Sequence, residues 1–291
     1  MKKDLTAMIN VSRRNRISLR LIICLLLVLI MLPQWAAAAY GDDITVYNSS
    51  GILNRPLSVD PVDRSDGFTA VMYNNSNGLP TSDANAIAQT GDGFIWIGSY
   101  AGLVRYDGNN FERIDPTAGI ANVRCLYIDS KDRLWIGTND SGVFLMTKGS
   151  LKNWGREDGL RSMSIRAIAE DDKGLIYVAG AAGGIAVISP GFELTQLDYQ
   201  NLEGQSVPQL RRGSDGLIYG FTQDGDLFTL YNGEVVRFIG HNSTRLKDVH
   251  SVMPDPEHPG RLYIGTSSES VCVGSFTNGF ASVTETDISP L

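Results

Sequence analysis

Polar residues recur at one position of a repeated strand pattern in this chain of 291 residues. Each lies two positions before an apolar residue that we expect in a core, at Ile87, Leu126, Ile168, Leu210 and Val252. The residues at the recurring position are Asn85, Arg124, Arg166, Pro208 and His250. On strands facing a common channel, the polar ones would present hydrogen-bond donors to an anionic or carbonyl-rich ligand. The alternative is that they face water at the rim, or pair with acidic residues of a neighbouring repeat. Arg211 and Arg212 are also candidates for ligand binding, although they do not stand at the recurring position.

An aromatic repeat predicts the elements that position these residues. Its five copies place Trp96, Trp135, Tyr177, Tyr219 and Tyr263 at successive spacings of 39, 42, 42 and 44 residues. A constant period near this length is typical of repeat architectures, in which single units cannot bury their apolar faces alone. Residues at a fixed place in every unit are more often packing residues than sugar-binding ones, so we interpret the five aromatics as structural.

Each repeat is predicted to contain four short strands. The first strands are expected at 84–89, 123–128, 165–169, 207–210 and 249–253, each followed by a turn rich in Asp and Gly. The aromatic strand and a third strand come next. The fourth strands are expected to begin at or near Phe111, Leu151, Phe192, Val235 and Phe280. Glycine suits the hairpin turns because it adopts positive φ at little steric cost. The pattern predicts an all-β fold, a β-propeller of four-stranded antiparallel blades with about five blades present in an incomplete ring.

The repeat boundaries follow from this pattern. The five blade repeats are predicted at 78–114, 115–157, 158–199, 200–240 and 241–283. Residues 40–77 form a lead-in, in which 68–73 resembles an outer strand that could close a ring, and 284–291 begin a further repeat or a tail. Closure of that kind would remove exposed sheet edges.

The motifs of the first two repeats resemble the two-component regulator propeller repeat. These motifs are Asn77-Gly78-Leu79-Pro80, Trp96-Ile97-Gly98-Ser99, Arg105-Tyr106-Asp107-Gly108, Trp135-Ile136-Gly137-Thr138 and Asp158-Gly159-Leu160. Later copies replace Trp with Tyr, and the similarity extends over roughly 68–283. The resemblance implies an extracytoplasmic input module of a bacterial sensor, whose output is a histidine kinase, a diguanylate cyclase or a DNA-binding regulator.

The N-terminus is predicted to be a signal peptide or membrane anchor over residues 1–39. A basic segment precedes an apolar run at 21–32 and the alanines at 36–39, which is the order found in secretory signals. This leader carries a net charge of +5, so its removal would change the formal charge from −7 to −12. A domain with this negative charge is not expected to bind nucleic acid, because phosphate backbones require a basic surface. The sequence therefore predicts export to the periplasm or the extracellular face of the membrane.

Catalytic and metal-binding motifs are not found. His241, His250 and His258 fall in the fifth repeat without a nucleophile or carboxylate at motif spacing. Cys125 and Cys272 occupy different places in their blades, so we expect two free cysteines. We expect no cofactor, no metal and no catalysis.

The leading interpretation is an extracytoplasmic ligand-sensing propeller of a signal-transduction protein, a fragment that lacks its output domain. Its partner would be a small molecule or glycan, with propeller–propeller association as a further option. One alternative is a self-contained secreted propeller that binds a glycan, peptide or protein. The minor alternative is a channel-type lyase or hydrolase, for which streptogramin-lyase-like propellers are a distant precedent.

Overall fold

The computed structural model describes residues 47–48, 51–52, 72–75, 78–244, 246, 248–267 and 270–282. The chain divides into two units, residues 1–71 and 72–291. In the first unit, β1 (Tyr47–Asn48) and β2 (Gly51–Ile52) pair antiparallel. The predicted leader (1–39), the segment 68–71 of the predicted closing strand and the tail (284–291) lie outside the described residues.

The second unit contains five four-stranded antiparallel sheets, each formed by strands that follow one another in the sequence. From inner to outer strand, the first sheet contains β3 (Ala86–Gln89), β4 (Ile95–Ser99), β5 (Gly102–Tyr106) and β6 (Phe111–Arg113). The second contains β7 (Val123–Ile128), β8 (Leu134–Thr138), β9 (Val143–Thr147) and β10 (Ser150–Trp154). The third contains β11 (Ile165–Glu170), β12 (Ile176–Gly180), β13 (Ile185–Ile188) and β14 (Leu194–Gln196). The fourth contains β15 (Gln209–Arg212), β16 (Ile218–Phe221), β17 (Leu227–Tyr231) and β18 (Glu234–Ile239). The fifth contains β19 (Val249–Pro254), β20 (Arg261–Thr266), β21 (Ser270–Ser275) and β22 (Gly279–Ser282).

Short helical turns join some of the sheets. Two 3₁₀ helices span Pro116–Ala118 and Arg156–Asp158, and α2 spans His241–Thr244. None of the helices among the described residues has the length and hydropathy needed to cross a bilayer.

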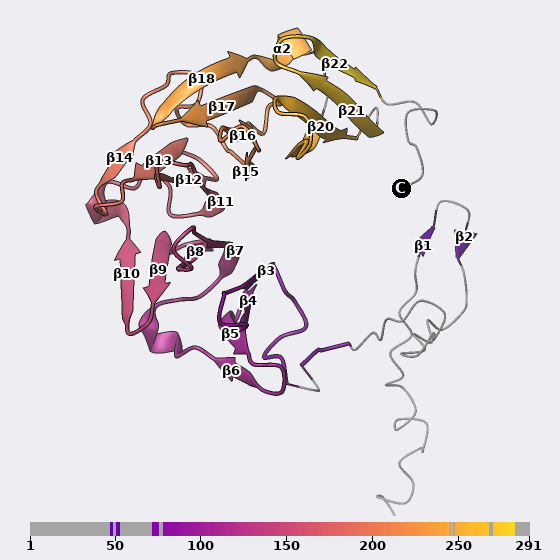
Figure 1. Ribbon diagram of the computed structural model, residues 1–291. Helices are drawn as coiled ribbons and strands as arrows, with labels where there is room; N and C mark the ends of the chain where they lie inside the picture. The colour runs from indigo at the N-terminus through magenta and orange to yellow at the C-terminus, as the bar shows by residue number, and fades with distance from the viewer. Residues whose placement is uncertain are drawn as a thin grey trace, which may run out of the picture. The chain divides into compact units, whose positions relative to one another are not determined.

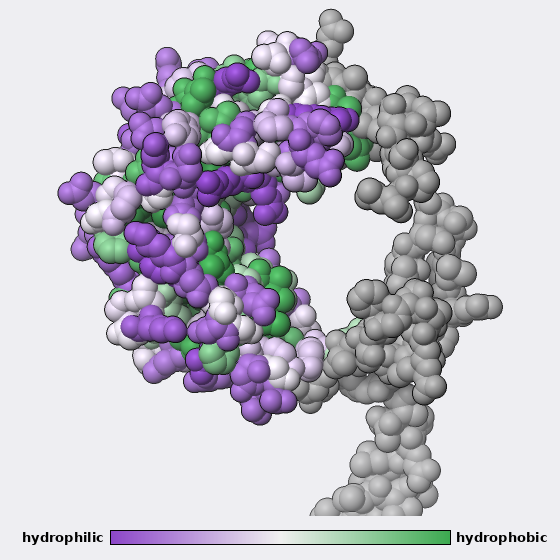
Figure 2. All heavy atoms as spheres, viewed as in Figure 1, coloured by the Kyte–Doolittle hydropathy of each residue, from purple (hydrophilic) through white to green (hydrophobic). Residues whose placement is uncertain are grey.

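The five sheets of this unit follow one another around an arc, with β3, β7, β11 and β15 on its concave side (Figure 1). β19 is the corresponding edge strand of the fifth sheet. The contacts between sheets join consecutive sheets, and innermost strands make most of them. This arrangement confirms the prediction of an all-β propeller fold with about five blades. On the face shown in Figure 2, hydrophilic residues cover much of the arc, and apolar patches lie between them.

Apolar cores fill the spaces between consecutive sheets. Trp135 and Tyr177 are fully buried, and Tyr219 is 2 % exposed, each in a core shared with the following sheet. The glycine two positions after the aromatic allows this close packing. A Cβ at Gly98 would lie 2.4 Å from Cγ1 of Val123, in the next sheet, and a Cβ at Gly137 would lie 2.8 Å from Cγ2 of Ile165. The Trp-Ile-Gly pattern therefore marks where one blade meets the next.

Ile87 was expected in a core, but it is 70 % exposed. Its counterparts Ile168, Leu210 and Val252 are at most 6 % exposed, because each faces the preceding sheet. β3 belongs to the first of the five sheets, so its corresponding face has no such neighbour among the described residues.

Two local details differ from the expected pattern. Of the segment 68–73, which resembles an outer strand, the described residues Met72 and Tyr73 are not in a strand. The Tyr73 ring instead packs on Tyr106 and Phe111 of the first sheet, with centroid distances of 5.5 and 5.1 Å. In the third repeat the fourth strand starts at Leu194, two residues after Phe192, because the turn extends over Phe192, which takes the positive φ of 67°.

A candidate cationic pocket on the inner strands

Three of the predicted ligand-binding residues lie at β-bulges. The pairing of inner strand with aromatic strand shifts register between Val123 and Cys125, between Ile165 and Ala167, and between Val249 and Ser251. The extra residues are Arg124, Arg166 and His250. A bulge leaves one residue outside the ladder and re-aims its side chain, which explains why the same blade position repeatedly faces away from the cores.

These residues line one cavity. We call it the inner-strand pocket, with a volume of about 560 Å³, and it is bounded by residues of all five inner strands. Its polar and ionisable lining residues are Asn85, Arg124, Cys125, Tyr127, Arg166, Gln209, Arg211, Arg212 and His250. The structure thus brings together the four predicted ligand-binding residues, with Pro208 beside them. A neighbouring cavity of about 620 Å³ shares Asn85, Arg124 and Arg166 and adds Ser206 and Gln223.

The inner-strand pocket is lined by positively charged side chains. Four arginines line it, and none of its lining residues is Asp or Glu. Among the described residues, the side chains of Arg124, Arg166, Arg211 and Arg212 form no hydrogen bond or ion pair. Their guanidinium groups therefore keep their donors for another partner, in a chain whose net charge is −7.

Other lining residues are already engaged in holding neighbouring strands together. The Asn85 side-chain amide donates to the Val123 carbonyl at 2.9 Å, and the Gln209 side-chain carbonyl accepts from the Val252 backbone N–H at 2.7 Å. His250 hydrogen-bonds through Nε2 to the hydroxyl of Ser267 in its own sheet. Asn85 and His250 therefore have fewer groups left for a ligand than the arginines have.

Two ionisable groups in the pocket are held neutral. Burial raises the pKa of the Cys125 thiol to about 12, against the weaker effects of Gly137, Arg124 and Arg166. Burial and the Glu170 carboxylate raise the pKa of Tyr127, while the nearby Arg212 acts in the opposite direction. Cys125 is a free cysteine, and Cys272 forms no disulfide. No sequence pattern pointed to Tyr127, Gln209 or Gln223, because none of them stands at the recurring position.

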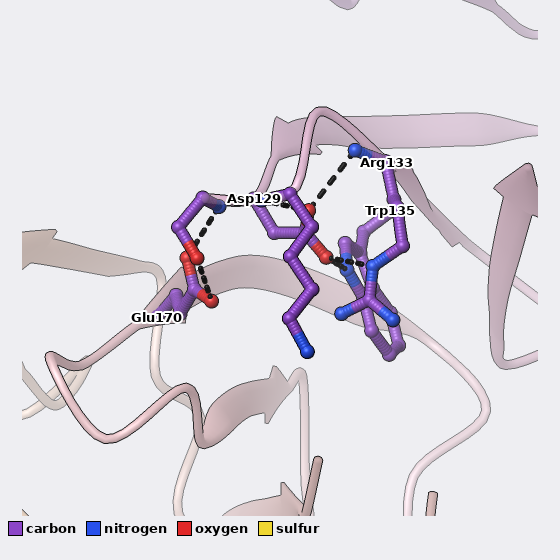
Figure 3. A network of polar contacts seen from close by, with 6 residues as sticks. Asp129, Arg133, Trp135 and Glu170 are labelled. Carbon is purple, nitrogen blue, oxygen red and sulfur yellow. Dashed lines mark hydrogen bonds and ion pairs between the residues drawn. The ribbon is translucent and has the colours of Figure 1, made fainter.

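The turns of the repeat form a second polar system, shown for the second sheet in Figure 3. Asp129, 5 % exposed, accepts from the backbone N–H groups of Lys131 and Arg133 at 3.0 Å. Its other oxygen accepts from Trp135 Nε1 at 2.8 Å and from Arg133 Nε at 2.6 Å. Glu170 of the next sheet accepts from the backbone N–H and the hydroxyl of Ser130 at 2.7 and 2.8 Å.

The same carboxylate-to-aromatic bond recurs along the array. Asp171, Asp215 and Asp255 accept from the hydroxyls of Tyr177, Tyr219 and Tyr263 at 2.8, 2.5 and 3.2 Å, respectively. In the first sheet Thr90 accepts from Trp96 Nε1 instead, at 3.1 Å, and donates to Asp92. With their oxygens engaged in this way, the turn carboxylates fix hairpins and strands, and we assign them no reactive role.

The three histidines of the fifth repeat are not brought together. His241 Nδ1 contacts Asp226 at 2.8 Å and His258 Nδ1 contacts Asp255 at 3.2 Å, whereas His250 faces the pocket. Over the described ranges, no three His, Cys, Asp or Glu side chains gather in a way that could hold a metal ion.

Comparison with known proteins agrees with the predicted family. Residues 78–101 and 119–140 match the family model described as Two component regulator propeller, so the predicted repeat is confirmed in the first two blades. No curated protein sequence matches the chain.

Several solved structures have a fold similar to that of the chain. The extracellular domain of BT4673 from B. thetaiotaomicron, described as a one component system, is 20 % identical with a TM-score of 0.62. The match covers 74 % of this chain and 32 % of that one, so the chain spans about a third of its relative. PorZ of Porphyromonas gingivalis, a surface component of the type-IX secretion system, is 16 % identical, with coverages of 76 % and 36 % and a TM-score of 0.58. A catalytically inactive virginiamycin B lyase from Staphylococcus aureus, solved with Quinupristin, is 15 % identical, with coverages of 69 % and 69 % and a TM-score of 0.55. At these identities the similarity supports the fold.

Proposed function

We propose that this two-component regulator propeller array is the extracytoplasmic ligand-binding part of a bacterial signal-transduction protein, and that it binds its ligand in the inner-strand pocket. The observation that carries the proposal is a group of four arginines in one cavity whose side chains make no hydrogen bond or ion pair with the part of the chain that the structure describes. Unpaired guanidinium groups suit the recognition of carboxylate, sulfate or phosphate, since their donors match these anions in pairs.

Binding is favoured over catalysis by the chemistry of the pocket. A lyase or hydrolase needs a group that takes or gives a proton, and the pocket offers the imidazole of His250 but no carboxylate. The Cys125 thiol, with its pKa raised to about 12, is a poor nucleophile at neutral pH. We therefore propose that the pocket binds without chemical conversion, and that binding favours one arrangement of the blades over another.

An exported location is part of the proposal. It is supported by the basic and apolar order of residues 1–39 and by the similarity of the fold to the extracellular domain of BT4673. A fusion of the full chain to alkaline phosphatase, an enzyme active only outside the bacterial cytoplasm, would test it. Active fusions are expected, and an inactive fusion that is stably produced would contradict export.

The binding function is tested by thermal unfolding of the full chain against a panel of neutral and anionic small molecules and oligosaccharides. A ligand of the pocket should raise the unfolding temperature of the wild type and protect the Arg166→Ala variant much less. Arg156→Ala is the matched control, because Arg156 is exposed and lies outside the pocket. Equal protection of all three proteins would place the ligand elsewhere and contradict the proposal.

A further inference from the structure

We propose that the inner-strand pocket selects an extended ligand with two anionic groups about 10 Å apart, and not a single small anion. This inference rests on the proposed binding function and specifies the ligand class. The shared chemistry is a pair of carboxylate, sulfate or phosphate groups on one molecule.

The first anion site is formed by the bulge arginines. Arg124 and Arg166 occupy the second position of β7 and β11, so they come from equivalent ends of neighbouring strands. Both also line the adjoining cavity with Ser206 and Gln223, which marks this end as the place where the two cavities meet. We call a position along the inner strands a level. Two guanidinium groups at the same level on adjacent strands can bind one anionic group together.

The second anion site lies farther along the strands. Arg211 and Arg212 end β15, three and four residues after Pro208, which stands at the blade position of Arg124 and Arg166. At ~3.3 Å per residue, three residues separate the two levels by about 10 Å. Arg212 also acts electrostatically on Tyr127 of β7, which places its charge near the strand that carries Arg124.

Within the described ranges, no acidic side chain neutralises the arginines of either anion site. No carboxylate lines the pocket, and Glu170, the acidic group beside Tyr127, is 2 % exposed and bonded to Ser130. Like charges held in one cavity repel one another, so a ligand that neutralises both levels gains more than one that neutralises a single level. A spacing requirement follows, because a short anion reaches one level at a time.

Calorimetric titration with two rigid probes tests the spacing. Biphenyl-4,4′-dicarboxylate holds two carboxylates at about the required separation, and biphenyl-4-carboxylate is the same ring system with one. We expect the dicarboxylate to bind wild type at least ten times more tightly. This advantage should disappear in Arg124→Ala/Arg166→Ala and equally in Arg211→Ala/Arg212→Ala, while Arg156→Ala should keep it. Thermal unfolding of each variant without probe checks that it is folded.

Equal affinity of the two probes for wild type would overturn the two-site inference, as would a dicarboxylate advantage that survives loss of Arg211 and Arg212. The proposed binding function would stand in either case if a panel ligand still protected wild type and failed to protect Arg166→Ala. If the inference holds, comparing oligogalacturonate with a sulfated oligosaccharide of equal length separates carboxylate from sulfate sources.

Discussion

Asp129 illustrates how a single carboxylate organises a blade. It bonds two backbone N–H groups of its own turn, the indole of Trp135 and the guanidinium of Arg133, and it is almost fully buried. Removing it would leave several buried donors without an acceptor. We expect Asp129→Ala to lower the free energy of unfolding by about 3 kcal/mol.

Chemical denaturation followed by Trp fluorescence measures this loss. Asp224→Ala is the control, because Asp224 is exposed in another turn, and we expect a change within about 0.5 kcal/mol. Equal effects of the two substitutions would mean that the turn carboxylate does not stabilise the blade.

The lowered pKa of Asp226 predicts that the stability of the protein depends on pH. Burial opposes its ionisation, but hydrogen bonds from the backbone and ring of His241 and from Thr222 outweigh burial and lower its pKa. The stability from this site is complete above the unfolded-state pKa of about 3.9, and it is lost as the pH falls through the lower folded-state pKa. The stability difference between wild type and Asp226→Asn should therefore shrink between about pH 5 and pH 3. A difference that stays constant over this range would contradict the prediction.

Residue spacing alone predicted four of the pocket residues, because equivalent positions in a repeat occupy equivalent places in space. Asn85, Arg124, Arg166 and His250 were identified by one offset from the apolar residues of the inner strands. The partners of these residues could not be predicted in the same way. The bonds from Asn85 to Val123 and from His250 to Ser267 depend on loop geometry, which the repeat does not determine.

At the level of strands, the sequence predicted the number and order of the elements well. β7 has the bounds expected for its strand, whereas β15 begins two residues later than expected, after Pro208. Proline has no N–H for the ladder, so it stays outside the paired strand. The bulges of β7, β11 and β19 were not predicted, because no residue type marks them, although they are what re-aims the pocket side chains.

Matched isoleucines on two inner strands test the role of neighbouring sheets. Ile168 packs against the preceding sheet and is 6 % exposed, whereas Ile87 holds the same place in the first sheet and is 70 % exposed. We expect Ile168→Ala to cost about 2 to 5 kcal/mol of unfolding free energy and Ile87→Ala less than about 1 kcal/mol. Similar losses, measured by denaturant titration, would show that another part of the molecule covers Ile87 in solution.

For the array as a whole, stability should be highest in the middle. The third sheet has packed neighbours on both sides, in two separate cores, whereas the first and the fifth each share one core with a neighbour. In repeat arrays, stability is approximately the sum of unit and nearest-neighbour terms. Amide hydrogen exchange should therefore be slowest in β11–β13 and faster in β3–β6 and β19–β22. Uniform protection across the five sheets would indicate a single cooperative unit.

The inner strands have one more consequence for the whole array. Contacts between sheets join neighbours in sequence, so the second and the fourth sheets are connected through the third. A ligand held by Arg124, Arg166 and Arg211 would touch all three sheets at once and add a direct link between the second and the fourth. Ligand binding in the inner-strand pocket would then make the three blades unfold more cooperatively and move less relative to one another, without any blade changing its shape.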